Sequence, residues 1–299
     1  MSAAARTVEL AALNQSARAE FVAALDGIFE NAPWVAEAVH GQRPFADLPR
    51  LMEAFAATIG SAGAKRQRAL IEGHPDLAGK AARAGELTAA SAAEQSSAGL
   101  DRLSPEEFDR FHRLNNSYRA RFDFPFIVCV RRHGKESILA QFERRLANDA
   151  ETERRTALAE ILRIAALRLD QRITGADRLK VNGRLSTHVL DTHRGRPAHG
   201  VAVELAELAG AGEARVIAGG TTNADGRTDT PLIGGRPVPI ARYELRFHLG
   251  AYYAGLGVSQ ADPPFLDVVP IRFAVAEPEG HYHVPLLATP WGYTTYRGS

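Results

Sequence analysis

The chain has 299 residues, a formal net charge of +1 at pH 7, and 45% hydrophobic against 24% charged residues. This length suffices for two domains with separate cores, and the near-zero charge gives no reason to expect a nucleic acid or a membrane surface as partner. No apolar run approaches the roughly 18 residues that span a bilayer, and the N-terminus lacks the pattern of a signal peptide, so we expect a cytoplasmic protein.

The first half of the chain carries helical patterns. Ser104-Pro-Glu-Glu107 is typical of a helix start, with a hydroxyl cap, a proline in the first turn and acidic residues near the positive end of the helix dipole. Apolar residues recur at three- and four-residue steps from Leu158 to Leu169, which predicts one apolar face on a long helix. Further helices are expected at 18–30, 47–60, 104–120 and 136–147.

The run 126–130 interrupts this helical half with five apolar residues, which could form either a strand or a buried helix. It contains Cys129, the single cysteine of the chain, and we expect a buried structural thiol there. One cysteine excludes an intrachain disulfide and a cysteine-based zinc cluster. The histidines and acidic residues show no spacing typical of a metal site, so no metal is expected.

From about residue 183 the pattern changes to period two. Proline also becomes denser, with six prolines in residues 1–171 and ten in 172–299. Alternating segments separated by turns predict a β-sandwich; they lie at 183–190, 201–205, 243–248 and 281–287. We therefore predict an all-α domain over 1–172, a short linker over 173–182, and an all-β domain over 183–299.

Three motifs in the second half appear in a recognisable order. They are LSTHVLDT (185–192) followed by GRPA (195–198), TNADGRTD (222–229), and the closing segment HYHVPLLATPWGYTTYRGS (281–299). Together they resemble the 5-hydroxyisourate hydrolases, the enzymatic relatives of transthyretin, over nearly all of 183–299. The resemblance implies a transthyretin-like sandwich and a homotetramer with active sites at subunit interfaces. It also implies a cyclic substrate, 5-hydroxyisourate, which water opens at a ring amide.

The same resemblance assigns residues to the hydrolase site. His188, Arg227 and His283 correspond to its catalytic positions, and the chain end lines the site with Tyr296, Arg297, Gly298 and Ser299, of which we take Ser299 as a further catalytic candidate. Two neutral imidazoles could take a proton from water and give one to the leaving nitrogen, while a guanidinium stabilises the oxyanion. His281 shares a strand face with His283, and only the family pattern selects between them.

A second series of motifs runs through the first half. It comprises GHPDLA (73–78), SAAEQ (91–95), NNSY (115–118), FDFPFI (122–127) and EILRIAALRL (160–169). The series resembles 2-oxo-4-hydroxy-4-carboxy-5-ureidoimidazoline (OHCU) decarboxylase, an all-helical family that needs no cofactor, over about 8–170. The resemblance implies His74 as the principal acid/base residue, with Glu94 also catalytic. It implies substrate contacts from Pro75, Ser91, Gln95, Ile127 and Arg168.

Helix geometry bears on part of this set. Ser91, Glu94 and Gln95 are spaced i, i+3 and i+4, so all three can face one pocket. Arg168 lies near the apolar face of its helix, where a guanidinium needs an anion such as a substrate carboxylate. Two other interpretations remain open: Ser91 and Glu94 could form a capping box, and Arg168 could extend to solvent.

The two resemblances together predict a bifunctional enzyme of urate breakdown, a fusion of the allantoin synthase type. Its partners would be the small molecules 5-hydroxyisourate, hydrolysed by the second domain, and OHCU, converted to (S)-allantoin by the first. Alternatives are a hydrolase whose helical domain serves only assembly, and a binding or scaffold protein without activity. A transthyretin-like carrier is a weaker alternative, because it should lack the His188, Arg227 and His283 set.

Overall fold

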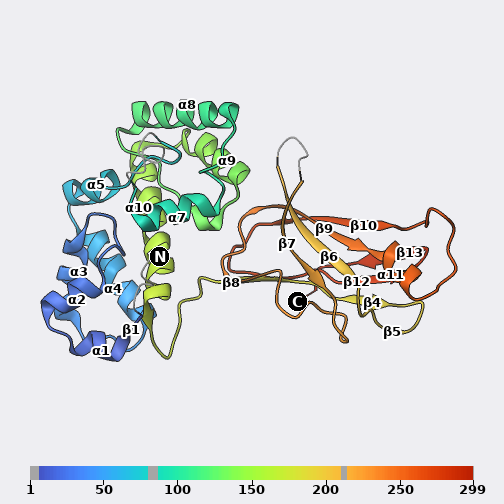
Figure 1. Cartoon of the computed structure of the whole chain (residues 1–299). Helices are drawn as coiled ribbons and strands as arrows, with labels where there is room; N and C mark the ends of the chain where they lie inside the picture. The colour runs from blue at the N-terminus through green and yellow to red at the C-terminus, as the bar shows by residue number, and fades with distance from the viewer. Residues whose placement is uncertain (1–6, 80–86, 210–213, 299) are drawn as a thin grey trace. The chain divides into compact units, whose positions relative to one another are not determined.

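The computed structural model describes residues 7–79, 87–209 and 214–298. Its contacts divide the chain into a helical unit that extends to Val181 and a strand-rich unit that begins at Asn182, and residues 132–137 group with the second unit. Figure 1 shows the helices in the first part of the chain and most strands in the last part. None of the described helices combines the length and apolar character needed to cross a bilayer.

The helices of the first part begin and end as follows: α1 Leu10–Gln15, α2 Arg18–Ala24, α3 Pro33–Val39, α4 Leu48–Ser61, α5 Ala64–Glu72, α7 Ala89–Ser97, α8 Pro105–Phe122, α9 Lys135–Arg145 and α10 Ala150–Arg172. Short 3-10 helices lie at His40–Gln42 and Val130–Arg132. Helices occur in all five predicted regions, although α2 is shorter than predicted and α10 longer. The predictions missed α1, α3 and α5, whose short lengths give little periodicity, whereas α7 contains the predicted helical trio Ser91, Glu94 and Gln95.

Helix starts follow the expected capping chemistry. The Ser104 hydroxyl accepts from the Glu107 backbone N–H at 3.2 Å, and the Glu107 carboxylate accepts from the Ser104 N–H at 2.9 Å, which completes a capping box for α8. Asp149 caps α10 by accepting from the Thr152 N–H at 2.8 Å. The apolar faces of α4 and α10 then supply much of the buried core of the helical unit.

The run 126–130 is neither a strand nor a helix, except that Val130 begins a 3-10 turn. Its backbone polar groups bond to buried side chains in place of a neighbouring strand. Arg145 donates to the Ile127 carbonyl at 2.7 Å, and Glu160 accepts from the Cys129 N–H at 2.8 Å. The prediction of regular structure here is therefore wrong, while the Cys129 side chain is buried as expected.

The helical unit also contains a small parallel strand pair, so the label all-α holds only coarsely. β1 (Val8–Glu9) pairs with β2 (Ile173–Thr174). The expected linker 173–182 thus begins inside the helical unit, where Ile173 is fully buried. Further along, the partly buried Leu179 and Val181 pack against the same core.

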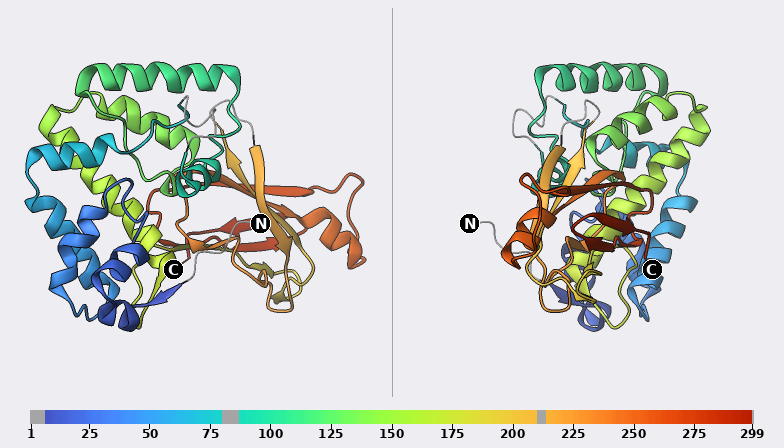
Figure 2. Two further views of the ribbon diagram at one scale, coloured as in Figure 1. Left: turned by 60° about the vertical axis from the view of Figure 1, so that its left-hand side comes forward. Right: turned by 90° about the vertical axis from the view of Figure 1, so that its right-hand side faces the viewer.

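The strands of the second unit are β3 Gly183–Ser186, β4 Val189–Asp191, β5 Arg196–Pro197, β6 Ala202–Leu208, β7 Ala214–Thr221, β8 Ile233–Arg236, β9 Ala241–His248, β10 Val268–Val275, β11 His281–His283, β12 Leu286–Thr289 and β13 Gly292–Thr295. They form sheets with the orders β10-β9-β6-β7, β11-β3-β8 and β13-β12-β4-β5. One helix, α11 (Leu249–Gly255), follows β9 and lies at one end of this unit (Figure 2).

Alternation along the strands builds the core of the second unit. Inward residues such as Leu205 of β6 and Leu245 of β9 join Leu185 of β3 and Leu286 of β12 in one buried cluster. Two predicted strands are each divided in two. The segment 183–190 separates into β3 and β4, and 281–287 breaks at Val284-Pro285 between β11 and β12.

Candidate active sites

The loop after α5 carries His74 into a pocket of the helical unit. Gly73 ends the helix beside the Glu30 carbonyl, which an added Cβ would approach to 3.3 Å. Two side chains fix the rest of the loop. Gln95 accepts from the Ala78 N–H at 2.9 Å, and Asn115 donates to the Leu77 carbonyl at 2.8 Å. Gln95 therefore also positions the loop that holds His74.

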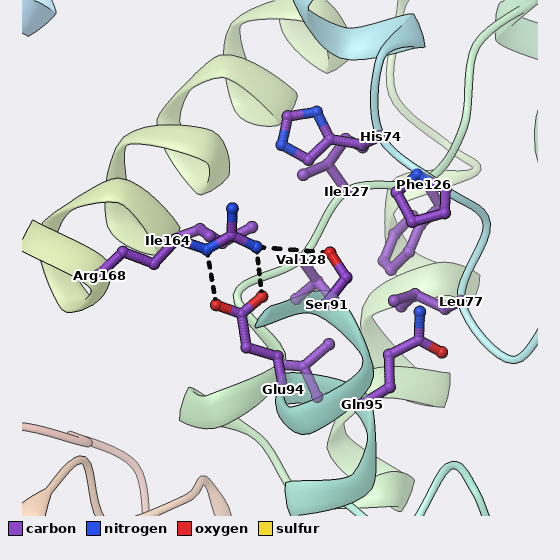
Figure 3. A pocket seen from close by; sticks show the side chains of 12 residues that line it. His74, Leu77, Ser91, Glu94, Gln95, Phe126, Ile127, Val128, Ile164 and Arg168 are labelled. Carbon is purple, nitrogen blue, oxygen red and sulfur yellow. Dashed lines mark hydrogen bonds and ion pairs between the residues drawn. The ribbon is translucent and has the colours of Figure 1, made fainter. Parts of the chain in front are cut away.

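All seven residues predicted for this site line one pocket, which Figure 3 shows from close by. His74 and Pro75 come from the loop, Ser91, Glu94 and Gln95 from α7, and Arg168 from α10. Ile127 belongs to the apolar wall, whose other members the sequence did not single out: Leu77, Phe126, Val128, Val130 and Ile164. The pocket thus combines polar and charged side chains with apolar ones.

The His74 ring is held in one tautomer. Its Nδ1 lies 2.9 Å from the Leu70 carbonyl, which can only accept, so Nδ1 carries the proton. Burial lowers the pKa of His74, an effect that the Arg168 charge strengthens and the Leu70 and Glu30 oxygens oppose. The ring is therefore neutral near pH 7, and the lone pair on Nε2 can accept a proton.

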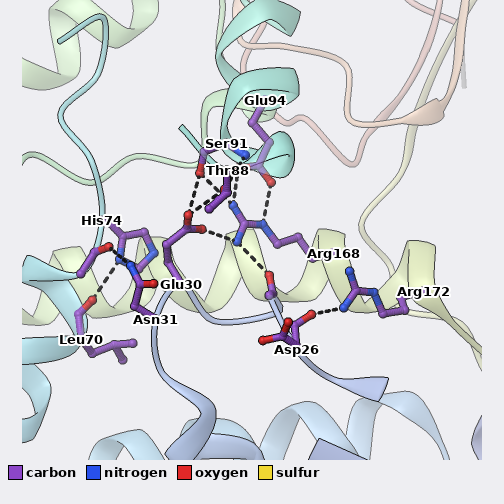
Figure 4. A network of polar contacts seen from close by, with 12 residues as sticks. Asp26, Glu30, Asn31, Leu70, His74, Thr88, Ser91, Glu94, Arg168 and Arg172 are labelled. Atoms are coloured by element: carbon purple, nitrogen blue, oxygen red, sulfur yellow. Dashed lines mark hydrogen bonds and ion pairs between the residues drawn. The ribbon is translucent and has the colours of Figure 1, made fainter. Parts of the chain in front are cut away.

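Arg168 is the centre of a buried ionic network (Figure 4). Its Nε and Nη2 each donate to one oxygen of Glu94 at 2.8 Å, and its Nη1 donates to Glu30 at 2.8 Å and to the Gly27 carbonyl at 3.0 Å. Nη2 also reaches the Ser91 hydroxyl at 3.4 Å. The predicted need for an anion is met here by two carboxylates, and the interpretation in which Arg168 extends to solvent is wrong.

Glu30 is the member of this network that sequence reasoning missed. It is 4% exposed and accepts from the Thr88 hydroxyl at 2.8 Å as well as from Arg168. Burial opposes its ionisation, but the hydrogen bonds from Arg168 and Thr88 outweigh burial and hold the Glu30 pKa below its usual value. One guanidinium thus serves two carboxyl groups, those of Glu30 and Glu94.

Ser91 lies inside α7 and does not cap it. Thr88 is the cap, because its side chain accepts from the Ser91 N–H at 3.2 Å. The Ser91 hydroxyl is left to face the pocket, where it donates to Glu30 at 3.3 Å. A capping box of Ser91 and Glu94 is therefore excluded, since the helix begins two residues before Ser91.

In the strand-rich unit, parallel pairing places the hydrolase candidates together. β11 runs parallel to β3 with His283 opposite Ser186, so these two side chains share a face. His188 lies two residues beyond Ser186 and keeps to the same side. Its ring packs on that of His283 at a centroid distance of 4.9 Å, with His188 Nδ1 2.7 Å from His283 Nε2.

A turn brings Arg227 beside this histidine pair. Gly226 has a φ of +71°, and an added Cβ would lie 2.3 Å from the Val189 carbonyl, so only glycine fits. The Val189 N–H donates to the Gly226 carbonyl at 2.8 Å, and His188 pairs with Arg227 in a backbone bridge. His188, Arg227 and His283 therefore converge from three segments of the chain.

Both imidazoles favour the neutral state. Burial lowers the pKa of His283 to about 4, with further effects from His188 and Arg227. Burial and the Arg227 charge also lower the pKa of His188. Near pH 7 this pair can act as proton acceptor and donor without first losing a proton to solvent.

The end of the chain folds over His283. The Gly298 N–H donates to the His283 carbonyl at 2.8 Å, and an added Cβ at Gly298 would lie 2.8 Å from the His283 ring. Arg297 stacks over Tyr282 at 5.0 Å, and Tyr296 is 54% exposed. Ser299 lies outside the described residues. Among the described members of the predicted tail set, Gly298 contacts a catalytic candidate.

Within the described parts of the chain, no group of three histidine, cysteine, aspartate or glutamate residues is placed to hold a metal ion. The pocket of the helical unit and the His188–His283 pair instead consist of acid/base side chains, with a guanidinium beside each.

Comparisons with known proteins agree with the division of the chain into a helical and a strand-rich unit. Residues 14–170 match the family model OHCU decarboxylase, and residues 185–298 match the HIUase/Transthyretin family. The chain is 53% identical over 119 residues to 5-hydroxyisourate hydrolase 2 of Rhizobium meliloti (strain 1021), covering 40% of this chain and 98% of that protein. It is 42% identical over 154 residues to 2-oxo-4-hydroxy-4-carboxy-5-ureidoimidazoline decarboxylase of Haloferax volcanii. This match covers 52% of this chain and 89% of that protein.

A solved structure matches both units at once. The crystal structure of (S)-allantoin synthase aligns with 98% of this chain and 100% of its own, at 34% identity and a TM-score of 0.51. The chain therefore belongs to the OHCU decarboxylase family through its helical unit and to the HIUase/transthyretin family through its strand-rich unit.

Proposed function

We propose that this chain converts 5-hydroxyisourate to (S)-allantoin in two steps. The strand-rich unit, as a transthyretin-like sandwich, hydrolyses 5-hydroxyisourate to OHCU, and the helical unit decarboxylates OHCU. The observation that carries the proposal is the presence of two separate acid/base centres. His188 and His283 lie 2.7 Å apart beside Arg227, and a neutral His74 faces a pocket with Arg168 and Glu94.

Hydrolysis needs a proton acceptor for water and a donor for the leaving ring nitrogen. A neutral histidine pair provides both, because the two rings can exchange a proton through their hydrogen bond. Arg227 is exposed and lies beside the pair, where its charge would bind an anionic substrate and stabilise the oxyanion. Gly298 would help to enclose the reacting group.

Decarboxylation needs little from the protein beyond orientation and proton transfer. As carbon dioxide leaves the carboxylate, its bonding electrons pass through the imidazoline ring to a ring nitrogen, which takes one proton from solvent, and an enol results. His74 Nε2 has a free lone pair, so it can take the hydroxyl proton of the substrate and return it to the carbon that bears the ureido group. One imidazole then performs both transfers, and delivery from one face gives one enantiomer.

The ionic network defines how substrate would meet the other pocket residues. All the N–H groups of Arg168 already have acceptors in Glu94, Glu30, Gly27 and Ser91. A substrate carboxylate therefore reaches Arg168 only by displacing one of these acceptors, such as Ser91, whose contact is the longest at 3.4 Å, or Glu94, the more exposed of the two acids. Glu94, Ser91 and Gln95 of α7 line the same pocket and would bind the ring and ureido N–H groups.

An enantiomer-resolved time course tests the two-step proposal. Freshly prepared 5-hydroxyisourate mixed with the full chain should yield (S)-allantoin without accumulation of OHCU. Accumulated OHCU would leave only the hydrolase, with the helical unit serving assembly. Decay of 5-hydroxyisourate no faster than in buffer would favour a binding or scaffold protein and contradict both activities.

We also infer that the chain assembles as a homotetramer through its strand-rich unit. β10 and β13 are edge strands of their sheets, and edges of this kind pair readily with another chain. Exposed apolar side chains lie on or beside them, including Val268, Trp291 and Tyr293. Sedimentation of the full chain as a monomer at micromolar concentration would contradict this assembly.

Replacing Gly298 with alanine should lower the rate of 5-hydroxyisourate hydrolysis by roughly 10- to 100-fold, since small displacements of catalytic groups have effects of this order. The added methyl would lie 2.8 Å from the His283 ring, so the ring or the tail must move. Gly255→Ala is the matched control, because Gly255 ends α11 and its Cβ would meet nothing within 4 Å. Equal rates for both variants would contradict a role for the tail in the site.

A further inference from the structure

A row of four polar side chains extends from the hydrolase candidates to the surface. His188 Nδ1 lies 2.7 Å from His283 Nε2, and His283 Nδ1 lies 3.0 Å from the Ser186 hydroxyl. The same hydroxyl lies 3.5 Å from His281 Nε2, at the outer limit of a hydrogen bond. His281 is exposed, whereas Ser186 and His283 are 7% and 8% exposed.

Strand register creates this row. His283 is opposite Ser186 in the parallel pair of β11 and β3, and His281 lies two residues before His283 on the same face. His188 continues that face beyond Ser186. The Ser186 hydroxyl is thus the link between the buried imidazole and the exposed one.

We propose that Ser186 is a positioning residue that fixes the tautomer of His283 and connects His188 to His281 in a proton relay. This inference rests on the proposed hydrolase function. A serine hydroxyl can donate through its proton and accept through its lone pairs, so it can pass a proton in either direction. His188 Nε2, which makes no hydrogen bond to the described residues, is the end of the relay that faces substrate.

The relay neither gains nor loses protons overall. When His188 Nε2 takes a proton from the attacking water, its Nδ1 proton passes to His283 Nε2. The Nδ1 proton of His283 then passes to the Ser186 oxygen, and the Ser186 hydroxyl proton passes to His281 Nε2. His281 releases one proton to solvent. One proton enters and one leaves, and the reverse sequence supplies the proton that the leaving nitrogen needs.

The charges around His283 favour passing a proton on to a neighbour over keeping it on the His283 ring. The groups that act on its ring electrostatically are His188, Arg227, His281 and Arg184, and all of them oppose a positive charge on it. Together with burial they lower the pKa of His283 to about 4. A proton on His283 is therefore short-lived, and it is displaced towards one of the neighbours in the row.

A matched pair of variants isolates the hydroxyl. Valine and threonine have nearly the same shape, so Ser186→Val and Ser186→Thr differ mainly in the hydroxyl group. We expect kcat for hydrolysis to be roughly 100-fold lower in Ser186→Val than in Ser186→Thr, because loss of tautomer control removes general-base catalysis. The acid limb of the pH profile should also shift between the two. Equal kcat values and superimposable profiles would overturn the proposal.

Thr187→Val is the control for loss of a neighbouring hydroxyl. Thr187 is 1% exposed and donates to the Val284 carbonyl at 2.6 Å, but it lies outside the row. Its kcat should stay near that of the wild type. If the wild type hydrolyses 5-hydroxyisourate while Ser186→Val equals Ser186→Thr, only the relay fails. Absence of hydrolysis in the wild type would instead remove the proposed function.

The outer end of the relay has its own readout. His281→Ala should be slower than the wild type in dilute buffer and should recover as imidazole is added, because a soluble base replaces the missing ring. A purely structural role for His281 predicts a loss that imidazole does not restore. That result, or no loss in dilute buffer, would overturn the relay from Ser186 to the surface. Decarboxylation measured on the same samples reports only on the helical unit, so denaturant unfolding of each variant checks that the strand-rich unit is folded.

Discussion

His74→Asn should lower the rate of OHCU decarboxylation by roughly 10²–10⁴-fold, the usual contribution of general acid–base catalysis, and leave hydrolysis of 5-hydroxyisourate unchanged. The asparagine amide can still donate to the Leu70 carbonyl, which His74 Nδ1 does at 2.9 Å. The substitution therefore keeps the hydrogen bond to Leu70 and removes the basic Nε2. Both steps are measured on one sample by following 5-hydroxyisourate, OHCU and allantoin over time.

The enantiomer of the product sharpens this test. In the variant, any allantoin should form by protonation from water, which has no preference for either face, so the product should be racemic. His112→Asn is the matched control, since His112 lies on α8 and is not among the residues that line the pocket. Loss of both activities in His74→Asn, or continued formation of (S)-allantoin at the wild-type rate, would contradict the assignment of the two steps to two units.

Local signals in the sequence located most of the helical pocket. Ser91, Glu94 and Gln95 follow helical spacing, and Gly73-His74-Pro75 lies at a helix end, where a motif can be recognised without knowledge of the fold. Glu30 could not be found in this way. It lies at the end of the predicted helix 18–30 but beyond the actual end of α2 at Ala24, and its partner Arg168 lies 138 residues later. Only tertiary packing brings the two together.

The same limit applies to the strand-rich unit. Period two placed His281 and His283 on one face, but it could not decide which ring meets His188. That choice depends on the parallel register of β11 with β3, which links residues about 97 positions apart. The prediction of regular structure for 126–130 is wrong for a related reason. Buried side chains of α9 and α10 make hydrogen bonds to its backbone groups in place of a neighbouring strand.

Replacing Arg168 with leucine should lower the free energy of unfolding of the helical unit by about 3–5 kcal/mol at pH 8, the usual cost of removing one partner from a buried ion pair. Glu30 is 4% exposed and would lose its hydrogen bond from Arg168, and Glu94 would lose both of its hydrogen bonds. Decarboxylation should fall as well, because Glu94 and Ser91 lose their common anchor. Denaturant unfolding followed by the helical circular dichroism signal measures the change.

The pH dependence of this loss follows from the Glu30 pKa, which lies below its usual value in the wild type. Its contribution to stability is therefore present above the unfolded-state pKa and is lost as the pH falls through the folded-state pKa. In Arg168→Leu, burial without a guanidinium should raise that pKa, so the variant gains stability as the carboxyl protonates. The difference between wild type and variant should thus be largest near pH 8 and shrink towards pH 4.5.

The double variant Arg168→Leu, Glu30→Gln separates charge from packing. Glutamine keeps the size of Glu30 and its acceptor for Thr88, but carries no charge to bury, so it should restore part of the stability lost at pH 8. Glu30→Gln alone leaves Arg168 bonded to Glu94 and should cost less than Arg168→Leu. A double variant less stable than Arg168→Leu, with a stability loss independent of pH, would mean that Arg168 acts through packing and that the two carboxylates do not need its charge.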